Sequence, residues 1–351
     1  MDKLIVRPLK ESGISTVIVI DALDECRDQQ PTSAILAALG QLVSKIPKVK
    51  FFVTGRPDPQ ILEDFHRPLL ESVSDMFVLH EVEPSQVADD IRLFFRQHFL
   101  ELADRRGGLD NWPSEEHLDL LCERAAGLFV YAVATLKFID HKNVCPRVQL
   151  DLILRSPKNS AYEGETRIGP NTTLDSLYMS ILQEAFGCDS TRNDSRVRSV
   201  PGALVLVANP LSPSAIAALL DIDSTGAFRK LSLIHSLLIL QGSDRPTQPF
   251  HKSFSDFIVD PTRFPNERFR VSPSSHHSEL LVGCLNLMNR TLEKNMCNLP
   301  EAVINSEIND LQERIERQLC PALRYACVSW HKHADEHTIR APEVLPALRC
   351  S

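Results

Sequence analysis

The sequence has few aromatic residues and no long hydrophobic run. Two tryptophans and four tyrosines occur among its 351 residues, and aromatic residues make up 6%. No apolar run reaches the roughly 18 residues that a membrane-spanning helix needs. The N-terminal residues have neither the hydrophobic region of a secretory signal nor the Arg- and Ser-rich character of a transit peptide. The sequence therefore predicts a protein without a membrane partner.

Paired cysteines and basic runs are also missing. The nine cysteines are scattered and odd in number, and none are spaced Cys-x-x-Cys. This pattern predicts reduced core thiols in a cytosolic or nuclear protein, and we expect a cytoplasmic one. The net charge is −8, the pI is near 5.9, and no run of lysine and arginine occurs. Because a nucleic-acid-binding face needs clustered basic residues, nucleic acid is not an expected partner.

The first 80 residues alternate short strands with helical segments. Apolar, strand-forming runs cover Thr16–Ile20, Val49–Val53 and Met76–Val82. Between the first two, Thr32–Ile46 places its aliphatic residues on one helical face and ends before Pro47. This rhythm predicts parallel strands, buried between helices, in an α/β sheet.

From Pro84 onward the pattern is almost wholly helical. Ser114 and Ser212 precede apolar helical runs and are expected to cap them, with a possible break at Gly127. The predicted fold class is mixed α/β, then mostly α. The expected domains are a partial α/β core (1–83), a helical subdomain (84–155), a polar linker (156–172), a winged helix of three helices and a β-hairpin (173–272), and a C-terminal helical region (273–351).

The first strand runs into a cluster of acids in "VIVIDALDEC", with Asp21, Asp24 and Glu25 within five positions. Adjacent carboxylates repel one another and resist desolvation. An apolar strand ending in an aspartate is what a Walker B element requires, because ligands bind at the carboxyl ends of parallel strands. Asp21 is the candidate Mg²⁺ ligand, and Asp24 or Glu25 the candidate catalytic residue that orients the attacking water. The alternative is a strand followed by a solvated acidic helix start.

The second strand also ends in polar residues, in "FFVTGRP". Thr54 follows the strand and Arg56 lies at its carboxyl edge. Neighbouring parallel strands bring such tips side by side, where an arginine would contact the terminal phosphate of a bound nucleotide. The alternative is an exposed arginine in a Gly-Arg-Pro turn.

Together, "VIVIDALDEC" and "KFFVTGRP" resemble the second half of a NACHT domain, the nucleotide-binding module of STAND-class signalling NTPases. The resemblance is closest to the large fungal group that often carries WD repeats downstream. Further matching motifs run from about Leu4 to Trp330: "AAGLFVYAVATLKFI", "LDSLYMSIL", "LSPSAIAALL", "FHKSFSDFIVDPTRF" and "ALRYACVSW".

The resemblance implies a partial P-loop-NTPase-like parallel sheet and a switch controlled by ATP or ADP with Mg²⁺, acting through protein partners or self-association, in fungal innate immunity or self/non-self recognition. Asp21 matches the Mg²⁺ aspartate, Asp24 the additional Walker B acid and Arg56 the sensor arginine. His251, in "FHKSF", resembles the winged-helix histidine that contacts the ADP β-phosphate. Without the resemblance, a histidine satisfied within the core is the favoured interpretation.

One expected element is missing. The 351 residues contain no Gly-x-x-x-x-Gly-Lys-Ser/Thr run, whose backbone amides and lysine would cradle the phosphates. No WD-type repeat follows either. The sequence is thus expected to represent a NACHT protein truncated at both ends, a regulatory binding module with weak or absent nucleotide binding. Two alternatives stay open: an active ATPase that receives its phosphate cradle from upstream or in trans, and an unrelated Mg²⁺-dependent phosphohydrolase using the three acids.

The C-terminal region carries a histidine-rich stretch, "HKHADEH". It brings His331, His333 and His337 close together in the sequence. This spacing without cysteine is weak for zinc, so an exposed helical end is the favoured interpretation.

Overall fold

The computed structural model describes most of the chain as two compact units. The described residues are 6–26, 29–43, 45–79, 82–109, 111–141, 144–155, 171–186, 196–263, 270–300, 304, 308–340 and 342–349. Unit 1 comprises Met1–Val82 and unit 2 comprises Glu83–Ser351.

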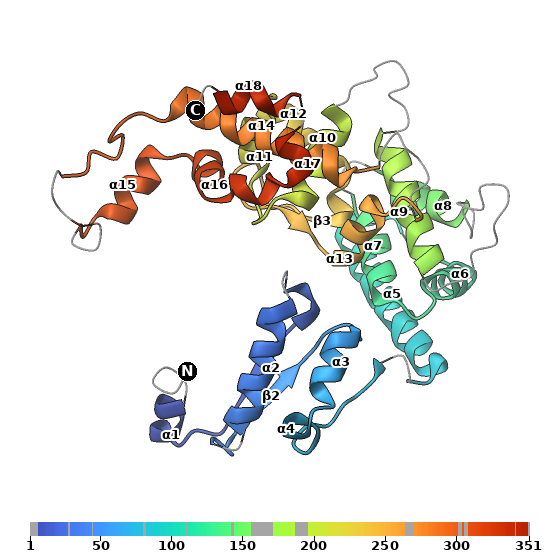
Figure 1. Ribbon diagram of the computed structural model, residues 1–351. Helices are drawn as coiled ribbons and strands as arrows, with labels where there is room; N and C mark the ends of the chain where they lie inside the picture. The colour runs from blue at the N-terminus through green and yellow to red at the C-terminus, as the bar shows by residue number, and fades with distance from the viewer. Residues whose placement is uncertain are drawn as a thin grey trace. The chain divides into compact units, whose positions relative to one another are not determined.

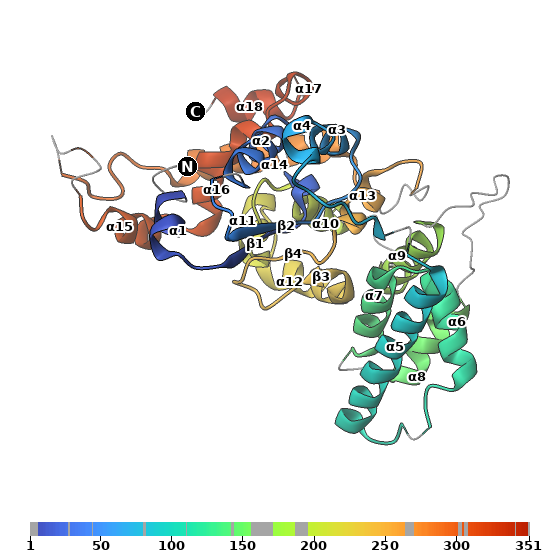
Figure 2. The ribbon, with the colours of Figure 1, turned by 90° about the horizontal axis from the view of Figure 1, so that it is seen from below.

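Unit 1 is an α/β unit built on two parallel strands. Its elements are α1 (Arg7–Ser12), β1 (Thr16–Ile20), the short 3₁₀ helix η2 (Leu23–Glu25), α2 (Gln29–Val43), β2 (Val49–Val53), α3 (Pro59–Phe65) and α4 (Pro68–Glu71). The strands pair in register from Thr16 opposite Val49 to Ile20 opposite Val53, and Figure 2 shows them side by side. The predicted parallel pairing of these two strands is confirmed.

Helices cover one face of this sheet. Leu36, Leu39 and Leu42 of α2 join Val49, Ile61 and Leu70 in one core, against which the alternate residues of both strands pack. The other face is apolar but open: Val17 is 58%, Val19 63% and Phe52 59% exposed. The expectation of a sheet buried between helices is therefore wrong for the described residues, because the core residues of α2, α3 and α4 pack with the first face while Val17, Val19 and Phe52 of the other face are exposed.

The third predicted strand is not formed. Residues 76–78 have no regular structure and Leu79 is in 3₁₀ conformation, so the described part of Met76–Val82 contains no strand. Phe77 is 77% and Leu79 76% exposed. An apolar run becomes a strand only where a neighbouring strand accepts its hydrogen bonds, and the described sheet has two members.

Unit 2 is almost entirely helical. Its helices are α5 (Pro84–Arg106), α6 (Glu115–Ala125), α7 (Phe129–Ile139), α8 (Pro146–Arg155), α9 (Asn171–Phe186), α10 (Arg196–Leu206), α11 (Pro213–Leu220), α12 (Ser224–Leu233), α13 (Lys252–Val259), α14 (Pro273–Thr291), α15 (Leu311–Gln318), α16 (Pro321–Ser329), α17 (Glu336–Ile339) and α18 (Val344–Arg349). The described residues of unit 2 also include two 3₁₀ helices, η4 (His235–Leu237) and η6 (Trp330–His333), and two short strands, β3 (Leu238–Ile239) and β4 (Gln248–Pro249). Figure 1 shows α5, α6, α7, α8 and α9 gathered as one group of helices.

The starts of several helices follow the capping rules. The Ser114 side chain accepts the His117 backbone N–H at the start of α6, and the Ser212 side chain accepts the Ala215 backbone N–H at the start of α11. The predicted break at Gly127 is also confirmed, because this glycine has φ +78° between α6 and α7. Local sequence signals therefore located these ends correctly.

The segment expected to be a winged helix, 173–272, contains most of α9 and all of α10, α11 and α12, then a short antiparallel pair, β3 with β4, and α13. Within this segment, the Tyr178 ring of α9 contacts the rings of Phe254 and Phe257 of α13. A bidentate ion pair holds α9 to the residues after α13: Arg263 Nε and Nη2 donate to the two Asp175 carboxylate oxygens at 3.1 and 2.6 Å. This pair fixes where α13 ends relative to α9.

The remaining expectations have mixed outcomes. Residues 156–170 of the expected linker lie outside the described part, whereas Asn171 already belongs to α9. All seven described cysteines are free thiols, as expected, but Cys26, Cys145, Cys320 and Cys327 are exposed, so the expectation of core thiols is wrong for them. No helix in the described ranges is long and apolar enough to cross a membrane.

Candidate functional site

The carboxyl ends of β1 and β2 are joined by Thr54. Its hydroxyl donates a hydrogen bond to Asp21 Oδ1 and accepts one from the Ala22 backbone N–H at 2.9 Å. Its own backbone N–H donates to the Ile20 carbonyl, and its carbonyl accepts from Leu23 N–H, both at 2.9 Å. Thr54 thus makes four hydrogen bonds to the segment that carries Asp21.

The loop between β1 and η2 makes a tight turn. Ala22 adopts a left-handed conformation with φ 53° and ψ 52°, which costs a non-glycine residue about 1–2 kcal/mol. Leu23, only 2% exposed, is buried in the core of unit 1 and offsets that cost. Burying a leucine side chain is worth about 1.5–3 kcal/mol. The turn therefore places Asp21 on the exposed side and Leu23 on the buried side of the sheet edge.

Asp24 and Arg56 form the second link across the two strand ends. The Arg56 backbone N–H donates to Asp24 Oδ1 at 3.0 Å, and Arg56 Nε lies 3.6 Å from Asp24 Oδ2. The Asp24 side chain is 9% exposed and the Arg56 side chain 45%. Both carboxylate oxygens of Asp24 thus face Arg56, which stabilises the arginine in place at the sheet edge.

The predicted residues of unit 1 therefore lie at one edge of the sheet. Asp21, Asp24 and Arg56 come together there, as the parallel pairing predicted, and Glu25 is exposed at the end of η2. The sequence does not predict the pairing of Asp24 with Arg56. It predicts a role toward water for Asp24 and a contact with the terminal phosphate for Arg56. The pairing disfavours Asp24 as a base, because a base must contact the water that it deprotonates.

This edge of the sheet offers Mg²⁺ a single protein ligand rather than a complete set. No group of three His, Cys, Asp or Glu side chains in the described ranges is arranged to hold a metal ion. Mg²⁺ bound with phosphates needs only one or two protein carboxylates, and the exposed Asp21 carboxylate fits such a single ligand. Its bond from Thr54 fixes one oxygen and leaves the other available for a metal or its bound water.

His251 belongs to unit 2 and caps α13. Its Nδ1 accepts the Ser253 backbone N–H at 3.2 Å, and the Ser253 hydroxyl lies 2.6 Å from the same atom. That hydroxyl also contacts the Tyr178 hydroxyl at 2.7 Å. Because Nδ1 is an acceptor, the neutral ring carries its proton on Nε2. His251 is exposed, so the alternative of a histidine satisfied within the core is wrong.

The comparisons with known proteins concern the part of the chain that carries the sheet edge. Residues 1–56 match the family model described as Nephrocystin 3, N-terminal. That family is related to NACHT-type proteins. The matched residues include Asp21, Asp24, Glu25 and Arg56, whereas His251 lies outside them. No curated protein and no solved structure matches the chain.

A buried polar chain in unit 2 was missed from the sequence. The Ala208 backbone N–H donates to the Tyr325 hydroxyl at 2.8 Å, the hydroxyl lies 2.7 Å from His333 Nε2, and His333 Nδ1 lies 2.8 Å from His277 Nδ1. His333 is 1% exposed, so the expectation of an exposed helical end is wrong for it. Its partners are 8 and 56 residues away in sequence, which a local pattern cannot indicate. The side chain of His337 lies outside the described part of the structure.

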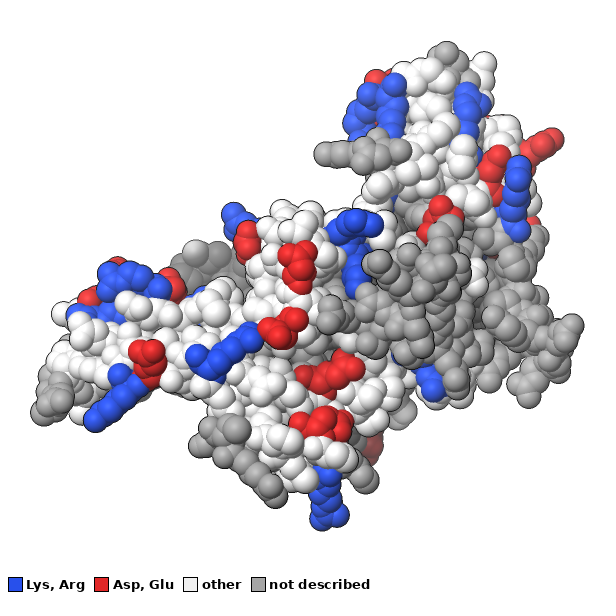
Figure 3. Space-filling model, turned by 90° about the horizontal axis from the view of Figure 1, so that it is seen from above, with Lys and Arg blue, Asp and Glu red and all other residues white. Residues whose placement is uncertain are grey.

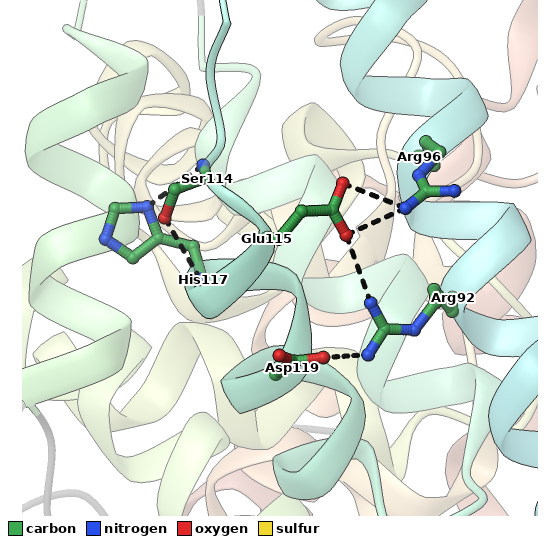
Figure 4. A network of polar contacts seen from close by, with 6 residues as sticks. All are labelled: Arg92, Arg96, Ser114, Glu115, His117 and Asp119. Carbon is green, nitrogen blue, oxygen red and sulfur yellow. Dashed lines mark hydrogen bonds and ion pairs between the residues drawn. The ribbon is translucent and has the colours of Figure 1, made fainter.

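Charged side chains elsewhere form structural pairs. In Figure 4, Arg92 and Arg96 of α5 reach across to Glu115 and Asp119 of α6. The Arg96–Glu115 distances are 2.8 and 2.9 Å. Figure 3 shows acidic and basic side chains interspersed on the face that it presents. These contacts hold α5 against α6 and do not resemble a basic nucleic-acid-binding face.

Proposed function

We propose that this chain is part of a NACHT-type nucleotide switch of the STAND class, similar to the fungal proteins that carry WD repeats, and that it signals through protein contacts. One observation carries the proposal: Thr54 and the Asp24–Arg56 pair join the two strand ends into a single edge. The edge lies within the residues that match the Nephrocystin 3 N-terminal family. A change at Arg56 would therefore be transmitted to the loop that carries Asp21.

In this proposal each residue has a limited role. Asp21 holds Mg²⁺ together with the nucleotide phosphates, and Mg²⁺ neutralises phosphate charge when it is bound. Arg56 contacts the terminal phosphate and is stabilised by Asp24 in its absence. Glu25 is the remaining candidate for orienting water. His251 donates from Nε2 to the β-phosphate of ADP.

The 351 residues include no phosphate-cradling loop, so we propose that they act as a regulatory binding module rather than as an ATPase on their own. Carboxylates alone present an unfavourable charge to a triphosphate. The exposed apolar face of β1 and β2 supports contact with a protein partner or a second copy. The interpretation as an unrelated phosphohydrolase is disfavoured. Its three acids would have to bind a metal ion together, whereas Asp24 is paired with Arg56 and no group of three such side chains in the described ranges could hold a metal.

The test compares the chain as given with the chain fused to a P-loop segment from a NACHT protein. Calorimetry should give a dissociation constant above about 1 μM for ADP with the chain alone, equivalent to a binding free energy weaker than about −8 kcal/mol. The fusion should bind more tightly, and Asp21→Asn should remove the Mg²⁺ dependence of that binding. Glu11→Gln, an exposed acid on α1, is the control. Tight binding without the P-loop, or none with it, would contradict the proposal.

A further inference from the structure

Three basic side chains of unit 2 gather where α7 meets η4. Lys137 lies in the last turn of α7, His141 follows the end of that helix, and His235 begins η4. The imidazole centroids of His141 and His235 are 4.6 Å apart, and His235 Nε2 lies 3.1 Å from the Lys137 carbonyl oxygen. The Lys137 ammonium lies 4.6 Å from the centroid of the Phe250 ring. We refer to Lys137, His141 and His235 as the basic cluster.

The basic cluster has no acidic partner in the part of the chain that the structure describes. The nearest acid in sequence, Asp140, forms ion pairs with two arginines of α5. Arg105 Nη2 lies 3.0 Å and Arg106 Nη2 lies 3.2 Å from its carboxylate oxygens. The contact of the Lys137 ammonium is with the face of Phe250. All three side chains of the cluster are half-buried, so their charges are screened less than surface charges are.

The contacts of His235 favour a protonated ring. Nδ1 lies 3.2 Å from the Ser232 carbonyl oxygen and Nε2 lies 3.1 Å from that of Lys137. Carbonyl oxygens only accept, so both contacts become hydrogen bonds only when both nitrogens carry hydrogen. Burial first, and then the neighbouring His141 and Lys137, nevertheless lower the pKa of His235 below its usual value. Burial also lowers the pKa of Lys137.

A negative charge beside the cluster would allow His235 to make both carbonyl contacts as hydrogen bonds. A neutral His235 leaves one carbonyl contact without a proton, and a charged ring is disfavoured by burial and by the nearby charge of Lys137. An anion beside the cluster would stabilise the protonated form of His235, because an opposite charge favours the charged ring. Among small anions, a phosphate group has about two negative charges and three acceptor oxygens, which matches two donors and a third cation.

We propose that the basic cluster binds a phosphate group, with the Lys137 ammonium and the His141 imidazole donating to its oxygens and His235 taking up a proton. The ring nitrogens of His235 stay on their two carbonyl groups, so this histidine contributes charge rather than a direct contact. The site stands on unit 2 alone and is independent of the nucleotide switch proposed for Asp21 and Arg56.

The experiment is calorimetry of the whole chain with sodium phosphate at pH 7, against sodium chloride at equal ionic strength. Two buffers of different ionisation heat measure the protons taken up. Phosphate should bind with proton uptake, and Lys137→Gln and His141→Gln should each weaken binding by about tenfold or more, because each removes a hydrogen bond to a charged group. His235→Gln should abolish the proton uptake. Lys332→Gln, an exposed lysine on η6, is the matched control and should change neither quantity.

Proton NMR of the histidine rings tests the same idea without a variant that could misfold. Phosphate should raise the pKa of His235 and leave the ring signals of exposed His331 unchanged. ADP and free phosphoserine then identify the source: ADP at least tenfold tighter than phosphate indicates a nucleotide, and equal affinities indicate recognition of the phosphate group alone. Phosphate binding no tighter than chloride, or binding that survives Lys137→Gln unchanged, would overturn the proposal.

Discussion

Replacing Thr54 by valine tests whether this side chain holds the edge of the sheet together. Valine has nearly the same shape but lacks the hydroxyl, so it removes the bond to the Asp21 carboxylate and the bond from Ala22 N–H. A hydrogen bond to a charged group is worth about 1.5–3 kcal/mol and a neutral one about 0.5–1.5 kcal/mol. Because the Asp21 carboxylate is exposed, the lower values apply and the sum is about 2 kcal/mol. That free energy corresponds to a roughly 30-fold change in the opening equilibrium of the loop.

Hydrogen exchange at the Leu23 amide measures this opening. Leu23 N–H donates to the Thr54 backbone carbonyl, which the substitution retains, so its exchange reports the whole loop rather than a lost acceptor. Thr54→Val should accelerate Leu23 exchange by roughly 30-fold if the opening costs about 2 kcal/mol less. Thr54→Ser keeps the hydroxyl and is the matched control. Equal Leu23 exchange rates in the two variants would refute the role given to Thr54.

Two further predictions concern unit 2. Because burial lowers the pKa of His235 below its usual 6.5, the unfolded chain binds more protons than the folded one below that pH. The free energy of unfolding should therefore fall as the pH drops from 7 toward 5, by at most about 1.4 kcal/mol per pH unit from this group, and His235→Gln should flatten the decline measured by urea denaturation at each pH. Asp175→Asn should cost about 3 kcal/mol, because it leaves the Arg263 guanidinium, 19% exposed, without its carboxylate. In the same urea assay the exposed pair of Arg155 with Asp151 is the control, and Asp151→Asn should cost less than about 0.5 kcal/mol; equal losses at both sites would contradict the estimate.

Local patterns in the sequence predicted much of the candidate site. The apolar run before Asp21 and the one before Thr54 identified two strands, and parallel pairing brought their ends together as expected. Capping residues such as Ser114 and Ser212 located helix starts because their hydrogen bonds reach only three residues along the chain. Predictions that depend on residues only three positions apart do not require knowledge of the rest of the fold.

Contacts between distant residues could not be predicted in the same way. Asp24 faces Arg56 across 32 residues, so two side chains with separate expected roles instead form one pair. Phe77 lies in an apolar run that local pattern assigned to a strand, yet the described sheet ends with β2. Whether a run of this kind becomes a strand depends on a partner that the run does not encode. The burial of His333 likewise depends on Tyr325 and on a histidine of another helix.

His251 separates a structural role from a nucleotide-binding one more sharply than the sequence allowed. As the N-cap of α13 it accepts the Ser253 backbone N–H, so His251→Ala should cost about 1 kcal/mol of stability whatever else the histidine does. Asparagine is among the best N-cap residues, so His251→Asn should restore that stability without restoring a donor at the position of Nε2. In the chain fused to a P-loop segment, both substitutions should weaken ADP binding by about ten- to a hundredfold, the equivalent of one hydrogen bond to a charged group. ATP binding should change less, and His331→Ala on the exposed η6 should change neither. If His251→Asn recovers ADP affinity together with the melting temperature, the histidine acts only as a helix cap, and its assignment to the switch is wrong.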